Sequence, residues 1–153
     1  LLVTQRDLQP SLGGVGYAVF ALAMTVGRFS GDRVVQRFGP RSIMVVGGIC
    51  AAAGFMIGAL VPSTAATLVG FALVGLGCSN IVPVLFTAAG RQHAMPAGAA
   101  VSAISTLGYA GILAGPAAIG WIAHMSSLPM AFAMLGVALV AVAASARFVV
   151  AGR

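Results

Sequence analysis

The fold is decided by residues 42–90, which read SIMVVGGICAAAGFMIGALVPSTAATLVGFALVGLGCSNIVPVLFTAAG and hold no charged side chain in 49 consecutive positions. A membrane-spanning helix needs about 20 apolar residues, so this stretch is long enough for two spans and a short turn. Val61-Pro62-Ser63-Thr64 supplies the turn, because proline stops one helix and a hydroxyl side chain caps the next. The stretch therefore predicts a helical hairpin that crosses a lipid bilayer twice.

Two further charge-free runs flank this hairpin, at residues 8–27 and 92–146. The first is long enough for one span, and the second for two spans separated by the Ser126-Ser127-Leu128-Pro129 turn. We expect an all-α, polytopic membrane helical bundle with five transmembrane helices, at about 10–29, 42–61, 64–90, 97–124 and 128–149. These helices form one transmembrane domain over residues 10–153, and residues 1–9 are read as the remnant of an extracytoplasmic loop.

The composition excludes a soluble globular domain. Hydrophobic residues make up 60% of the chain, charged residues only 7%, and the mean hydropathy is +1.08, whereas soluble domains devote about a quarter of their residues to charge. The net charge of +6 comes from eight Arg against two Asp. Most of these Arg lie between apolar runs, which indicates a topology signal and not a nucleic-acid surface. The expected surroundings are therefore a lipid bilayer.

The Arg positions predict the orientation. Seven of the eight Arg fall in connections, or after the last helix, on one side of the predicted bundle, and only Arg6 falls on the other. The positive-inside rule then places the start outside and the C-terminus in the cytoplasm. The excess of Ala and Arg without Lys is typical of a GC-rich bacterial genome. We therefore expect a multi-pass protein of the bacterial cytoplasmic (inner) membrane, with Trp121 as an interfacial anchor near the outer end of its helix.

Polar side chains divide the helices into two groups. The helices at 42–61 and 128–149 are almost purely apolar and are expected to face lipid. The other three carry polar groups, which at bilayer depth face protein or a watery cavity more often than lipid. The candidate cavity residues are Tyr17, Ser79, Asn80, Ser102, Thr106 and Tyr109. No Asp, Glu, His, Lys or Arg lies in the middle of any predicted span, so the sequence does not identify a coupling ion.

Two of these helices carry further signals. Pro83 leaves the carbonyl of Ser79 without its helical donor and bends the helix beside Asn80. Asn80 then either contributes to a midplane binding site or only donates a hydrogen bond to a neighbouring helix. In the helix at 97–124, Gly108, Gly111 and Gly115 form a stripe that would allow another helix to approach closely.

The connection between the first two helices, residues 27–41, reads GRFSGDRVVQRFGPR. It resembles the signature loop of the major facilitator superfamily of secondary transporters, in which a Gly, an Asp-Arg pair and a second Gly precede basic residues. The matching gating-loop residues are Gly27, Arg28, Asp32, Arg33, Arg37, Gly39 and Arg41. The wide spacing of these residues looks like the sugar-permease-like branch that includes fucose permeases.

The resemblance implies a carrier of a small solute that works by alternating access. Five helices from this loop onward match the C-terminal half of such a carrier without its seventh helix, so the chain is expected to be a fragment whose N-terminal half is missing. The resemblance also implies a cytoplasmic latch at Asp32, about 15 Å from the midplane. The alternative is that Asp32 pairs locally with an Arg and the loop only sets topology.

Other functions were weighed against transport. A non-transporting membrane subunit or a truncated remnant remains the alternative function. An intramembrane enzyme is not expected: Ser79 lies deep in its span, and neither His93 nor His124 can approach its hydroxyl to the required distance of about 3 Å. We therefore predict no catalytic residue, no cofactor and no metal site.

Overall fold

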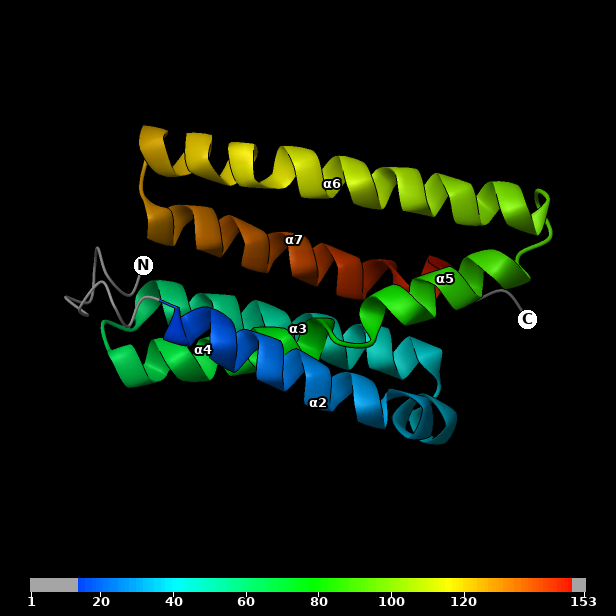
Figure 1. The fold of residues 1–153 in the computed structure, drawn as a ribbon, viewed down its shortest axis with the longest axis horizontal. Coiled ribbons are helices and arrows are strands. Elements are labelled where there is room, and N and C mark those ends of the chain that lie inside the picture. Colours follow the sequence, from blue (N-terminus) through cyan, green and yellow to red (C-terminus); the bar gives the residue numbers. More distant parts are fainter. Residues whose placement is uncertain (1–13, 150–153) are drawn as a thin grey trace.

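The computed structural model describes residues 14–149. These residues form helices and no strand, which confirms the prediction of an all-α fold (Figure 1). The helices are α2 (Val15–Phe38), α3 (Pro40–Leu60), α4 (Thr64–Cys78), α5 (Ile81–Arg91), α6 (Ala97–Met125) and α7 (Leu128–Val149). The loop remnant expected at residues 1–9 lies outside the described residues.

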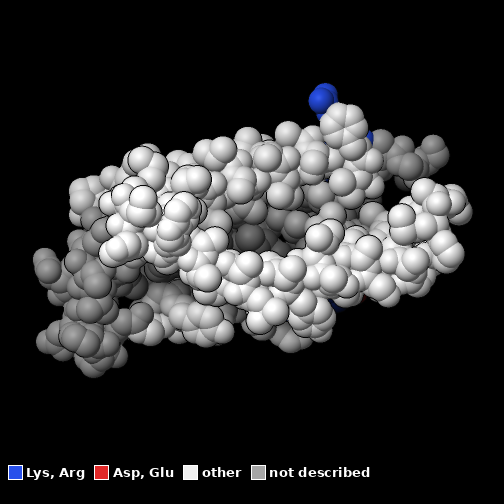
Figure 2. Space-filling view, turned by 90° about the horizontal axis from the view of Figure 1, so that it is seen from above, with Lys and Arg blue, Asp and Glu red and all other residues white. Residues whose placement is uncertain are grey.

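Four stretches of the described chain are long and apolar enough to cross a membrane. They are α3, the α4–α5 pair taken as one unit, α6 and α7. In Figure 2 one face of the bundle is nearly free of charge, and blue Arg atoms are visible only in its right half. The bundle is thus a polytopic membrane protein.

Successive spans run in alternating directions, so their connections fall at two ends (Figure 1). Gly39, residues 92–96 and the end of α7 lie at one end, which we call the arginine end because Arg37, Arg41, Arg91 and Arg147 are near it. Residues 61–63 and the turn between α6 and α7 lie at the opposite end. The expected grouping of the Arg-bearing connections is therefore present.

The first expected connection is not a loop. Helix α2 continues to Phe38, nine residues beyond the end predicted at 29, and the turn into α3 consists of Gly39 alone. Gly39 has φ +80°, a conformation that glycine adopts without steric cost. Pro40 then starts α3, where its missing N–H removes no helical hydrogen bond. The charged residues before Gly39 do not end the helix, so it continues until Gly39-Pro40.

The span expected at 64–90 is broken near its middle. Helix α4 ends at Cys78 and α5 begins at Ile81, with Ser79 and Asn80 between them. Pro83 explains the break, since it has no N–H to donate to the carbonyl of Ser79. The chain tightens instead, and the Ser79 N–H bonds to the carbonyl of Leu76 at 3.3 Å.

Helix α3 is the centre of the described bundle, packed between α4 and α7. Its contact with α4 is a glycine seam formed by two reciprocal pairs, Gly47 with Gly77 and Gly54 with Gly70. A Cβ placed on Gly47 would lie 2.5 Å from the Gly77 carbonyl oxygen, and one on Gly54 would lie 2.5 Å from the Gly70 oxygen. The two pairs are seven residues apart on each helix, or two turns, so both lie on one face.

The expected division into outer and inner helices holds only in part within the described chain: α7 is mostly exposed or half-buried, and α2 and α4 pack together, but α3 and α6 differ from the expectation. Helix α3 was expected to face lipid, yet seven of its residues are buried. Helix α6 was expected to be an inner helix, yet Ala100 is its only buried residue in the described chain, and its main contacts are with α5 and α7. Apolar composition could not separate the two, because lipid tails and packed helices are equally apolar surroundings.

Candidate functional site

The break between α4 and α5 lies against α2 on a bed of two glycines. A Cβ on Gly27 would collide with the Ser79 hydroxyl, and a Cβ on Gly31 would collide with the side-chain oxygen of Asn80. Gly27 and Gly31 are four residues apart, so they lie on the same face of α2. The two polar side chains can reach the α2 backbone only because these positions carry no side chain.

Hydrogen bonds join the break to α2. The side-chain amide of Asn80 donates to the carbonyl of Gly27 at 3.1 Å and to the hydroxyl oxygen of Ser79 at 3.0 Å. The Ser79 hydroxyl donates in turn to the carbonyl of Leu76, and Ser79 is only 1% exposed. The interhelical hydrogen bond is the one that the packing alternative for Asn80 required.

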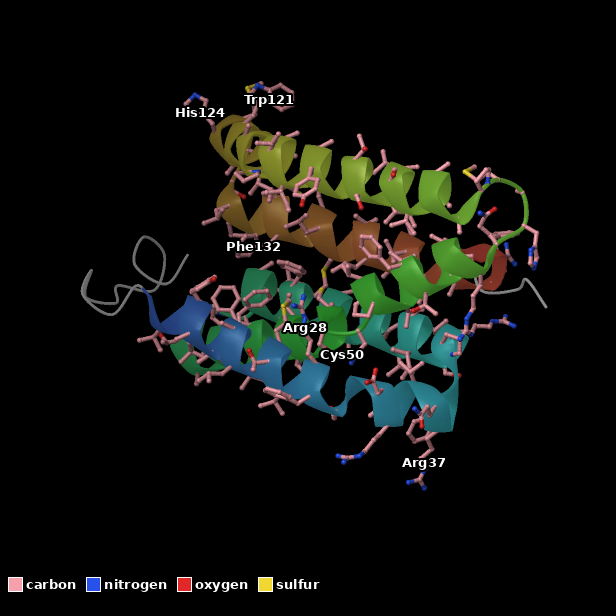
Figure 3. All side chains as sticks on the ribbon, turned by 45° about the vertical axis from the view of Figure 1, so that its right-hand side comes forward. Arg28, Arg37, Cys50, Trp121, His124 and Phe132 are labelled. Atoms are coloured by element: carbon pink, nitrogen blue, oxygen red, sulfur yellow. The ribbon has the colours of Figure 1, made fainter. Side chains whose placement is uncertain are left out.

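Arg28 lies halfway along α2, one residue after the contact with Ser79. It precedes Gly39 by eleven residues, which is about 16 Å of helix, and Figure 3 shows it near the middle of the bundle while Arg37 lies near one end. The first helix was predicted to end at residue 29, which placed Arg28 at its end, whereas α2 continues past it; α2 is not among the four apolar candidate spans of the described chain. We call Gly27, Arg28, Gly31, Ser79 and Asn80 the midspan cluster.

Asp32 is an exposed residue of α2, not a loop residue. Among residues 14–149 no Arg nitrogen lies within 4.0 Å of its carboxylate, so the local Asp–Arg pair is not formed there. The N-terminus of α3 also has no side-chain cap. Asp32 directly follows Gly31, which touches Asn80, so it lies one residue along α2 from the contact with the break.

The remaining gating-loop residues mark the arginine end of the bundle. Arg33, Arg37 and Arg41 are exposed, and the Arg37 guanidinium lies over the Phe38 ring, 5.5 Å from its centroid. They bring three positive charges to the α2–α3 turn, which is the pattern that the positive-inside rule uses.

The other candidate cavity residues do not join the midspan cluster. Tyr17 is 75% exposed near the start of α2, and Tyr109 is 69% exposed on α6. Ser102 and Thr106 are also exposed on α6, and the Thr106 hydroxyl donates to the Ser102 carbonyl of its own helix at 2.9 Å. The sequence thus located one polar break correctly, whereas a single cavity lined by all six residues is not present within the described chain.

The glycine stripe of α6 has no neighbour in the described chain. Gly108, Gly111 and Gly115 have nothing within 4 Å of the position of a Cβ atom. Trp121 and His124 lie at the end of α6 away from Arg37 (Figure 3), and Trp121 is 67% exposed. The face of α6 that was expected to pack is therefore open.

Sequence reasoning missed two parts of the site. The first is the glycine bed, for which the signal is the Gly27-xxx-Gly31 spacing. The second is the mid-height position of Arg28, for which the signal is the lack of any Pro or Gly-Pro pair between Arg28 and Gly39. Both were hidden because residues 27–41 were read as a connection.

Known proteins are similar in sequence to most of this chain. An uncharacterized MFS-type transporter of Yersinia pestis is 55% identical over 148 residues, which cover 97% of this chain and 38% of that protein. The membrane protein MosC of Rhizobium meliloti is 38% identical over 127 residues, covering 83% of this chain and 31% of MosC. An uncharacterized transporter of Sinorhizobium fredii is 30% identical over 138 residues, covering 89% and 37% respectively.

The chain spans less than two fifths of the length of these relatives. No solved structure is significantly similar to it. The family model of the Major Facilitator Superfamily matches residues 1–152. Together with the helical membrane bundle and the signature residues of α2, this match shows that the chain belongs to the Major Facilitator Superfamily.

Proposed function

We propose that the chain forms the last five helices of a secondary transporter that moves a small solute by alternating access. The family supports a transporter, and the position of the signature residues between the first two of the five predicted spans supports this placement. The N-terminal half and a seventh helix would then supply the missing walls. The arginine end would face the cytoplasm of a bacterium, with the C-terminus on that side, because Arg-rich connections are retained inside.

The midspan cluster is the observation that carries the proposal. It combines a broken helix, a side-chain amide and a mid-height Arg, which is how carriers present polar groups to a solute within a membrane. An Arg at the centre of a spanning helix costs about 2.5–3.5 kcal/mol on insertion scales. Such a residue is retained where it faces water or a bound group, and Arg28 is exposed. We place Arg28, Ser79 and Asn80 on the wall of the solute cavity.

Helix α6 supplies the other side of that wall in the complete carrier. Ser102, Thr106 and Tyr109 lie on the exposed part of α6, and Tyr17 lies on the exposed part of α2. If these side chains face the missing helices, they line the solute cavity. The stripe at Gly108, Gly111 and Gly115 would pack against one of those helices. The wide Gly–Asp–Gly spacing supports the sugar-permease-like branch, which would make the solute a polyol or sugar.

The signature residues give the gate. Asp32 has no Arg partner in the described chain, so its carboxylate is available to a helix N-terminus of the missing half, where an anion is favoured by about 0.3–2 kcal/mol. The latch would form in one gate state only. Its position on α2, which also carries Gly27, Arg28 and Gly31 of the midspan cluster, would couple the gate to the site.

Substitution of Asn80 tests the proposal. Cells producing the complete carrier are given a mixture of small solutes, and the accumulated solutes are measured by mass spectrometry together with the amount of carrier at the surface. Asn80→Ala should lower uptake per carrier about 5- to 150-fold, since loss of the half-buried amide leaves its polar partners unsatisfied at a cost of about 1–3 kcal/mol. Thr87→Ala is the matched control, because the exposed Thr87 hydroxyl donates only to the Pro83 carbonyl of its own helix, and uptake should stay within about twofold.

Two outcomes would contradict the proposal. If Asn80→Ala lowers surface abundance but leaves uptake per carrier unchanged, Asn80 serves packing alone. If no solute distinguishes cells with the carrier from cells without it, the protein is a non-transporting membrane subunit or a remnant.

A further inference from the structure

A recess on the outside of the bundle lies between α3 and α7, remote from the midspan cluster. Its volume is about 500 Å³, and it is lined by Arg41, Val45, Ile49, Val140, Ala143, Ala144 and Arg147. On α3 the lining residues are four apart, and on α7 they are three or four apart, so each helix contributes one continuous stripe. Both helices are long and apolar enough to span a membrane, and a recess on their outer side would then open toward lipid.

Small residues explain why the recess exists. The floor is the close approach of α3 to α7, where a Cβ placed on Gly48 would lie 2.9 Å from the Ala143 side chain. Ile49 and Val140 form the walls and are 54% and 52% exposed. Along α3 the recess runs from Arg41 to Ile49, eight residues or about 12 Å. It is therefore a narrow apolar groove that begins at the arginine end.

The charges of the groove are at one end only. Arg41 is the second residue of α3, and Arg147 lies two residues before the end of α7. Both are exposed, and within residues 14–149 neither has a carboxylate partner. Asp32, the one acid of that range, makes no ion pair there. Two positive charges that line one groove repel each other, so an anion between them lowers the energy of both.

We propose that this groove binds an anionic phospholipid, with its phosphate between Arg41 and Arg147 and an acyl chain along Val45, Ile49 and Val140. Basic pockets between spanning helices on the cytoplasmic side are suited to anionic headgroups. The charge at the level of the membrane surface and the apolar groove below it match the two parts of a lipid. A soluble anion would use the Arg pair and leave the groove empty.

Native mass spectrometry of the protein extracted from membranes in mild detergent tests the proposal. The lipids offered are phosphatidylglycerol, cardiolipin and phosphatidylethanolamine. The unchanged protein should retain phosphatidylglycerol or cardiolipin in preference to phosphatidylethanolamine. The double change Arg41→Gln with Arg147→Gln should weaken binding of the anionic lipid about thirtyfold. The matched control, Arg37→Gln with Arg91→Gln, removes the same charge from the same end outside the groove and should weaken it less than threefold.

A second variant separates a lipid from a free anion. Ala144→Phe fills the groove from an exposed position and keeps both Arg, so it should also reduce lipid binding at least tenfold while leaving the protein folded. Unchanged lipid binding by Ala144→Phe, or displacement of the lipid by millimolar inorganic phosphate, would show an anion site without an acyl groove and overturn the proposal. Equal losses in the control pair, or a second copy of the chain occupying the groove, would also overturn it.

Discussion

The seam between α3 and α4 and the open face of α6 carry the same residue, glycine, with opposite results. In the seam, Gly54 and Gly77 bring the two backbones so close that a Cβ on either would lie 2.5 Å from a carbonyl oxygen of the other helix. On α6, Gly111 has nothing within 4 Å of its Cβ position. A glycine pattern therefore shows that a helix can be approached closely, but not that the approaching helix belongs to the same chain.

The two regions also differ in how they carry polar groups. Next to the seam, Ser79 and Asn80 are bound to neighbouring backbone, and the Gly27 bed holds them in place. On α6, the Thr106 hydroxyl bonds to its own helix, so its surroundings can change without leaving it unpaired. The side chains of the packed region are thus held by contacts with neighbouring helices, whereas the open face of α6 can accommodate another helix.

The largest expected effect is in the seam. In Gly77→Leu the first side-chain carbon would lie 2.5 Å from the Gly47 carbonyl oxygen and 2.6 Å from the Ala51 backbone nitrogen. Overpacking of this kind destabilises by about 1–3 kcal/mol, which lowers the folded-to-unfolded ratio about 5- to 150-fold. Thermal unfolding in detergent measures it. Gly90→Leu is the control, because Gly90 is exposed and has nothing within 4 Å; equal melting temperatures for the two variants would show that the seam is not tightly packed.

Much of the helix layout could be predicted because its signals are local. The helices predicted at 97–124 and 128–149 are Ala97–Met125 and Leu128–Val149, since their ends are set by Arg, Pro and Ser in the connections. The position of Pro83 located the polar break to within four residues of Ser79. Whether residues 10–153 form one domain stays a prediction.

The remaining features depend on contacts between helices, which residue chemistry alone does not encode. The first helix was ended too early because Arg28 and Asp32 were taken as signs of a loop. Arg and Asp are both compatible with a helix interior, and Gly27 and Gly31 hold this part of α2 against Ser79 and Asn80. The central position of α3 was missed for a similar reason, since its apolar residues suit lipid and protein equally.

A smaller effect is expected from removing the charge of Asp32, which directly follows the packed Gly31 on α2. Asp32→Asn should remove the latch and shift the inward–outward ratio of the complete carrier about two- to thirtyfold. The shift is measured as the rate at which Tyr109→Cys reacts with an impermeant thiol reagent from outside, with Cys50 and Cys78 replaced. Asp32→Glu keeps the charge and serves as the control. Equal rates for the two Asp32 variants would mean that the charge does not act on the gate.

The smallest effect on this chain is expected on α6. Gly111→Leu should leave the melting temperature of this chain unchanged or slightly raised, because no atom stands in the way of the new side chain and glycine disfavours a helix by about 0.5–1 kcal/mol relative to Ala. In the complete carrier the same change should lower stability by about 1–3 kcal/mol if a missing helix packs on the stripe. The two proteins are therefore compared by thermal unfolding under one set of conditions. A large loss of stability in this chain would show that α6 already packs through Gly111. If neither protein loses stability, the glycine stripe faces lipid, and α6 resembles the seam in sequence alone.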